Sequence, residues 1–210
     1  MFGKPTILGS LMAANYFRDK EPTMAWNTDA QHTSFEFAVR HMVVSTVRGR
    51  FDEFAVEAVI DETDLTRSKG KVVVRTGSVS TREAQRDAHL SSPDFFDAES
   101  YPEMTYVVTG IAGADGRYTI TGDLTIKDVT REVVLDAEVS GPVADPWGST
   151  RIGLSATGKL NRKDFGLTWN VVTEAGGLLV GDDVKLSIDA EFVKAREAVE
   201  AEAATTGATA

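Results

Sequence analysis

Alternation of apolar and polar residues constrains the fold of this chain more than any other feature. It is clearest in residues 34–41, 54–60, 133–139 and 184–192, where every second side chain is mostly aliphatic or aromatic. The intervening side chains are mostly charged, hydroxylated or small. A period of two with one polar face is typical of antiparallel strands. The pattern therefore predicts an all-β chain of about eight strands.

An antiparallel sheet of this size has two exposed edges, which closure into a barrel removes. We therefore predict an extended antiparallel β-barrel, and 210 residues suit a single domain of this kind. We place the barrel at residues 24–194, after an N-terminal extension at 1–23. The Ala/Glu-rich segment at 195–210 predicts a short, frayed C-terminal helix.

One segment breaks the alternation. Ser80-Thr81-Arg82-Glu83 matches a capping box, and the composition of Ala84 to Leu90 is typical of a helix that stops before Pro93. We expect this short helix to lie over one end of the barrel.

Periodicity alone does not say what fills the barrel. The inward faces are aliphatic and aromatic, and a small barrel either packs such side chains together or leaves room for one ligand. Both alternatives remain open on the pattern alone.

Composition excludes several classes of protein. Cysteine is absent, which rules out disulfides and thiolate metal sites. The formal net charge of −10 opposes binding to nucleic acid and also disfavours electrostatic docking on an anionic membrane. The apolar run Ile7 to Met12 is too short to span a bilayer.

Catalytic and metal-binding motifs do not emerge from the sequence. Residues 153–158 do not fit a nucleophile elbow, and no phosphate-cradling glycine loop is present. The spacing of His32, His41 and His89 does not support a metal site, and His32 is expected in a turn, bonded to backbone. Residues 161–166 are predicted to form a turn whose charges pair among themselves. Trp147 and Trp169 are predicted to close the barrel.

Polar groups gather on the predicted helix. Arg86 and His89 are three residues apart, so they share one helix face. They fit a clamp for a ligand headgroup or an acid/base pair. They equally fit a surface helix that hydrogen bonds tie to the barrel rim.

Seven segments, in order, resemble the polyisoprenoid-binding, YceI-like family between Ala25 and Val193. The most specific is Gln85-Arg86-Asp87-Ala88-His89-Leu90, followed by Ser92-Pro93-Asp94-Phe95-Phe96-Asp97 and Tyr101-Pro102. The other segments are residues 32–42, 47–51, 122–130, 145–148, 161–170 and 179–182.

The resemblance implies a lipocalin-like extended barrel that holds a long isoprenoid chain, such as a polyprenyl or an isoprenoid quinone, for storage or transport. It implies no catalysis and no cofactor. We expect these residues to line the apolar cavity: Phe35, Phe37, Val39, Phe51, Phe54, Val56, Leu124, Leu135, Leu154, Trp169 and Leu186. Arg40, His41, Arg86 and His89 are expected at its polar mouth.

Two other functions remain as alternatives. One is an enzyme that acts on a lipid or quinone through Arg86, Asp87 and His89, and the other is a filled barrel that binds a protein. Many members of the family carry a periplasmic signal peptide, and residues 1–14 make a poor one. We therefore expect the cytoplasm, with the periplasm as the alternative. We expect no stable membrane insertion, and the chain is compatible with a homodimer.

Overall fold

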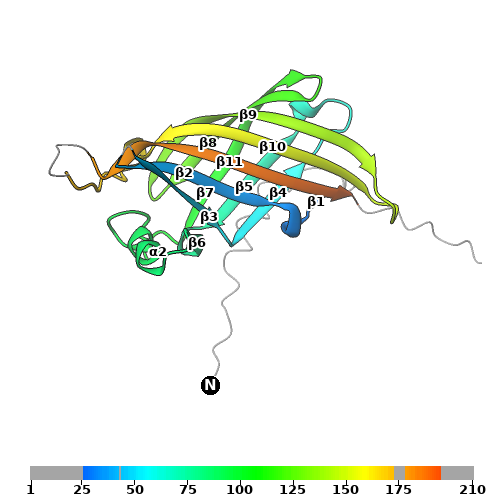
Figure 1. The fold of residues 1–210 in the computed structure, drawn as a ribbon. Helices are drawn as coiled ribbons and strands as arrows, with labels where there is room; N and C mark the ends of the chain where they lie inside the picture. The colour runs from blue at the N-terminus through cyan, green and yellow to red at the C-terminus, as the bar shows by residue number, and fades with distance from the viewer. Residues whose placement is uncertain (1–25, 43, 173–177, 195–210) are drawn as a thin grey trace, which may run out of the picture.

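A computed structural model of the chain describes residues 26–42, 44–172 and 178–194. These residues form one antiparallel sheet that curls into a half-barrel (Figure 1). Its strands are β1 (Trp26–Thr28), β2 (Ser34–His41), β3 (Ser45–Phe51), β4 (Phe54–Val59), β5 (Lys69–Arg75), β6 (Val79–Ser80), β7 (Glu103–Ala114), β8 (Arg117–Ile126), β9 (Val129–Ala144), β10 (Thr150–Asn161) and β11 (Val180–Lys194). The helices are η1 (Ala30–His32), η2 (Leu65–Arg67), η3 (Thr76–Ser78), α2 (Ala84–Ser91) and η4 (Arg162–Phe165).

The all-β, lipocalin-like prediction is confirmed. Neighbouring strands follow the order β4-β5-β7-β8-β9-β10-β11-β2-β3-β6, and β1 pairs with β11 beside this path. Of the eleven strands in the described residues, only β1 and β6 have fewer than six residues. Hydrogen bonds close the corner between the two ends of the path: the N–H of Asp52 donates to Ser78 O (3.1 Å) and that of Glu53 to Ser78 Oγ (3.0 Å).

Regular register gives the sheet its consistent inner face. β10 and β11 pair over twelve residues, from Thr150–Lys194 to Asn161–Asp183. Along such a ladder every second residue faces inward, so one apolar set converges on a shared interior. Ile120, Leu135 and Ala156 belong to the largest buried cluster of this interior, together with Phe165 from η4.

The predicted helix is present, but it begins one turn later than a cap at Ser80 requires. Ser80 is paired with Arg50 in the sheet, so its backbone is already committed to a strand. Arg82 then turns the chain at φ +64°, and Glu83 is the N-cap. Its carboxylate accepts from the N–H groups of Gln85 (3.1 Å) and Arg86 (2.7 Å). The predicted capping box is therefore wrong, although the helix is correct.

The predicted extension at 1–23 and the predicted C-terminal helix at 195–210 lie outside the described residues. The boundaries at 24 and 194 stay predictions.

Glycine is required at position 122 on β8 because neighbouring atoms lie too close to leave room for a Cβ. A Cβ there would meet the ring of Tyr106 and lie 2.7 Å from Val107 O. The Tyr106 hydroxyl donates to Val133 O (3.0 Å) and Ile120 O (3.2 Å), so moving the ring would also break these bonds. We expect Gly122→Ala to lower the free energy of unfolding by about 2 kcal/mol.

Gly110→Ala is the matched control, because a Cβ at Gly110 has nothing within 4 Å. Urea titration should show a change within about 0.5–1 kcal/mol for this variant. Equal losses in the two variants would contradict the steric explanation.

Candidate ligand-binding cavity

An apolar cavity of about 710 Å³ lies inside the curled sheet. Its walls come from all the strands except β1 and β6, and the side chains that face it are mainly aliphatic and aromatic. This volume falls within the range of about 300–1,000 Å³ that is usual for ligand sites. The interior is thus hollow, which the alternation left undecided.

Fourteen of the fifteen expected site residues line this cavity. They are Phe35, Phe37, Val39, Phe51, Val56, Leu124, Leu135, Leu154, Trp169, Leu186, Arg40, His41, Arg86 and His89. Phe54 does not: its ring packs edge-on against Phe35 at 4.9 Å, in the cluster around Phe51, Val74 and Val79. Phe54 opens β4 at the closed corner, so its side chain fills that corner. Ligand contact by the other fourteen stays a prediction.

Thr81 ties α2 to the sheet. Arg86 donates to Thr81 Oγ1 through Nε (2.7 Å) and to Thr81 O through Nη2 (3.0 Å). Asp87 Oδ1 accepts from the backbone N–H of Thr81 (2.8 Å) and from its hydroxyl (2.5 Å). Arg86 and Asp87 therefore both hold the helix against the end of the barrel. This is the structural alternative that the sequence left open for Arg86 and His89.

His89 belongs to a separate group. Its Nε2 lies 3.0 Å from Asp94 Oδ2, and its ring is edge-on to Trp169 (4.6 Å between centroids) and Phe95 (5.1 Å). Since Asp87 bonds to Thr81 instead, the structure does not join Arg86, Asp87 and His89 into one acid/base unit.

Arg162 is a buried cation that the sequence interpretation missed. Its side chain is only 3% exposed, and it donates to the carbonyls of Gly181 (2.9 Å), Trp169 (2.9 Å) and Leu167. Asp182 lies 3.3 Å from Nη2. Burial lowers the pKa of the guanidinium, and Asp182 opposes this shift.

The prediction that the charges of the turn at residues 161–166 pair among themselves is therefore wrong. Arg162 and Lys163 both pair with Asp182 at the start of β11, not with charges of their own turn. The alternation could have predicted that Arg162 faces inward. Leu154, Ala156 and Leu160 face inward on β10, and Arg162 is the next even-numbered residue in that series. Trp147 also departs from its prediction, because it is 82% exposed in the β9–β10 connection.

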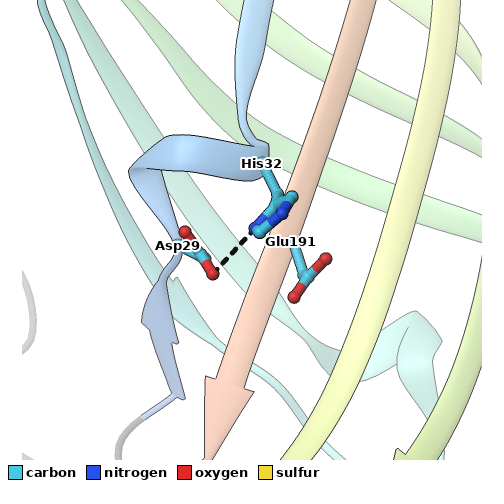
Figure 2. A group of neighbouring side chains, drawn as sticks. All are labelled: Asp29, His32 and Glu191. Atoms are coloured by element: carbon cyan, nitrogen blue, oxygen red, sulfur yellow. Dashed lines mark hydrogen bonds and ion pairs between the residues drawn. The ribbon is translucent and has the colours of Figure 1, made fainter.

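A second polar group lies at the opposite end of β11. Asp29, His32 and Glu191 come together there, with ligand-type atoms within 4.8 Å of one another (Figure 2). Arg151 already pairs with the carboxylates: it contacts Asp29 Oδ2 (3.2 Å), Asp145 Oδ2 (2.9 Å) and Glu191. The arrangement is that of an ion-pair network clamping η1 to β10 and β11.

His32 bonds to a side chain in this network, not to backbone as predicted. Its Nδ1 lies 2.9 Å from Asp29 Oδ2. This bond raises the pKa of His32, and, as the largest cause, it lowers the pKa of Asp29 to about 2.

The raised pKa of His32 sets the direction in which its contribution to the stability of the fold changes with pH. A raised folded-state pKa means that His32 stabilises the fold fully below its unfolded pKa, about 6.5. The contribution is lost as pH rises through the folded-state value. We expect the difference in urea midpoint between wild type and His32→Gln to be larger at pH 5.5 than at pH 8.5. A constant difference would contradict this assignment.

A family model described as "YceI-like domain" matches residues 26–192. The chain belongs to the YceI-like family. A UPF0312 protein of Staphylococcus aureus strain MSSA476 is 36% identical over 165 residues, which cover 78% of this chain and 94% of that protein.

Solved structures agree with the fold. The Campylobacter jejuni YCEI protein is 26% identical, with a TM-score of 0.65 over 93% of this chain and all of that one. BcnA of Burkholderia cenocepacia has a TM-score of 0.67 at 20% identity, covering 79% of this chain and 99% of that one. A polyisoprenoid binding domain from Saccharophagus degradans has a TM-score of 0.60 at 17% identity, covering 82% and 100%. In the described part of this YceI-like chain, no helix is both long and apolar enough to cross a membrane.

Proposed function

We propose that this YceI-like chain binds a long-chain isoprenoid or a similar amphiphilic lipid, for storage or transport. The observation that carries the proposal is the apolar cavity of about 710 Å³ enclosed by the sheet. The Saccharophagus degradans neighbour, described as a polyisoprenoid binding domain, supports the same class of ligand.

Burial of the chain supplies the affinity in this proposal. Each buried CH₂ contributes about 0.8 kcal/mol, from which the cost of ordering the lipid is subtracted. The polar end would lie near Arg40, His41, Arg86 and His89, which line the cavity. Because Arg86 is already bonded to Thr81, we propose that it positions the helix as well as facing the ligand.

Native mass spectrometry of the purified protein tests the proposal, combined with organic extraction of anything bound. We expect a polyprenyl or isoprenoid quinone at near-equal stoichiometry, or saturable binding when polyprenyl alcohols are titrated into apoprotein. Absence of both would overturn the proposal and favour the protein-binding alternative.

The enzyme alternative has its own test. Turnover of a prenyl or quinone substrate that depends on pH and disappears in His89→Ala would establish it. His89, which lines the cavity and bonds to Asp94, is the side chain that such catalysis would use.

We propose the cytoplasm as the compartment, with the periplasm as the alternative. Fractionation of cells that express the full chain distinguishes the two.

A further inference from the structure

Exposed apolar side chains gather at one end of the barrel. Eight large apolar side chains are exposed within the described residues, and five of them lie on the β2–β3 turn and the segment before β11. We call these five the apolar rim: Met42, Val44, Val171, Val172 and Leu178. The other three, Val134, Val143 and Trp147, lie on or beyond β9.

Backbone contacts hold the apolar rim together. The N–H of Met42 donates to Leu179 O (2.9 Å), and that of Leu179 donates to Val171 O (2.9 Å). Val172 and Leu178 form a β-bridge. Two segments more than a hundred residues apart thus form one platform at the end of the sheet where β2 ends and β11 begins (Figure 1).

The apolar rim is continuous with the cavity. Arg40 and His41 precede Met42, and Leu179 and Val180 follow Leu178, and all four line the cavity. A lipid that entered or left the cavity at this end would cross the rim.

Local charge at the rim differs from that of the whole chain. Arg40 and Arg48 are exposed on the two strands that meet at Met42 and Val44, and residues 38–50 contain no acidic residue, although the formal net charge is −10. The third arginine of this span, Arg50, pairs with Asp52 toward the other end of β3, and residues 171–178 contain one acidic residue, Glu174. The acidic residues that open β11 are paired: Asp182 with Arg162 and Lys163, and Asp183 with Lys159 at 2.7 Å. The acidic network at Asp29 and Glu191 lies toward the far end of β11, and salt screens charges beyond about 10 Å.

We propose that the apolar rim docks on a lipid bilayer surface and that the cavity exchanges its lipid there. The inference rests on the proposed lipid-binding function. Aliphatic side chains beside arginines match the acyl boundary and the anionic headgroups of such a surface. The net charge of −10 predicted the opposite, because a net charge does not say where on the surface the charges lie.

Vesicle flotation tests the docking. The matched variants are Val44→Asp/Val172→Asp on the rim, where the side chains are 83% and 70% exposed, and Val134→Asp/Val143→Asp on β9, where they are 46% and 62% exposed. We expect wild type to float with 3:1 phosphatidylcholine/phosphatidylglycerol vesicles and less with phosphatidylcholine alone. The rim variant should retain about a tenth of that binding, and the β9 variant nearly all of it.

Farnesol titration in vesicle-free buffer separates docking from the cavity. Equal farnesol affinity in all three proteins, with flotation lost only in the rim variant, supports the proposal. Absence of wild-type flotation, or equal flotation of the two variants, would overturn docking while leaving the cavity function intact. A shift from dimer to monomer in the rim variant, without flotation of wild type, would make the rim a protein interface and also overturn it. Rim-dependent flotation without farnesol binding would support docking and contradict the proposed function.

Discussion

The Ala156→Phe variant is expected to bind a long polyprenyl alcohol at least about tenfold more weakly than wild type. Ala156 lies on β10, opposite Ala137 on β9 and Ile188 on β11, and it is 1% exposed. Its side chain lines the cavity, so an added phenyl ring extends into the space that the ligand would occupy.

The expected size of the effect comes from the displaced lipid. The ring excludes roughly one five-carbon isoprene unit, which corresponds to about 4 kcal/mol of burial at about 0.8 kcal/mol per carbon. Part of this is recovered because the displaced unit is no longer ordered. A short probe such as farnesol can use the remaining volume, so its affinity should fall less.

Thr157→Phe is the matched control, since Thr157 is exposed on the outer face of the same strand. Fluorescence titration should give wild-type affinity for this variant. Urea unfolding of Ala156→Phe checks that the fold persists, because overpacking costs about 1–3 kcal/mol. Undiminished affinity of a folded Ala156→Phe protein for the long chain would mean that the lipid binds elsewhere.

Alternation predicted the sheet because it is a local property of each strand. Residues 184–192 show it in isolation, and they form the centre of β11. The hollow interior depends instead on how far apart the walls lie, which is set by the curl of the whole sheet. Leu135 and Leu186 would show the same period in a filled barrel. The family resemblance, not the period, supplied that expectation.

For the polar residues too, the local sequence predicted some features, and long-range contacts determined the others. A helix at Ala84 was predictable from composition, but its cap was not, because pairing of Ser80 with Arg50 overrides the local motif. Asp182 is twenty residues from Arg162, and no local pattern links them. Such long-range pairings decide which charged side chains stabilise the fold and which can contact a ligand.

Removal of Arg162 should destabilise the fold by about 3–5 kcal/mol, because three carbonyls lose hydrogen bonds from a charged donor, each of which contributes about 1.5–3 kcal/mol. In Arg162→Met the carbonyls of Gly181, Trp169 and Leu167 lose a common donor, and Asp182 loses one of its two cations. These groups tie the segment after η4 to the start of β11.

Arg162→Lys isolates the role of geometry. A lysine keeps the charge but lacks the planar fork that reaches several carbonyls at once, so about 2 kcal/mol of the loss should persist. Lys163→Met is the matched control, because Lys163 contacts the same Asp182 at 2.8 Å from an exposed position. An exposed pair contributes about 0–1 kcal/mol. Free energies of unfolding from urea titration should therefore rank wild type and Lys163→Met together, then Arg162→Lys, then Arg162→Met. If Arg162→Met were as stable as Lys163→Met, the buried guanidinium would not be what holds the segment after η4 against β11.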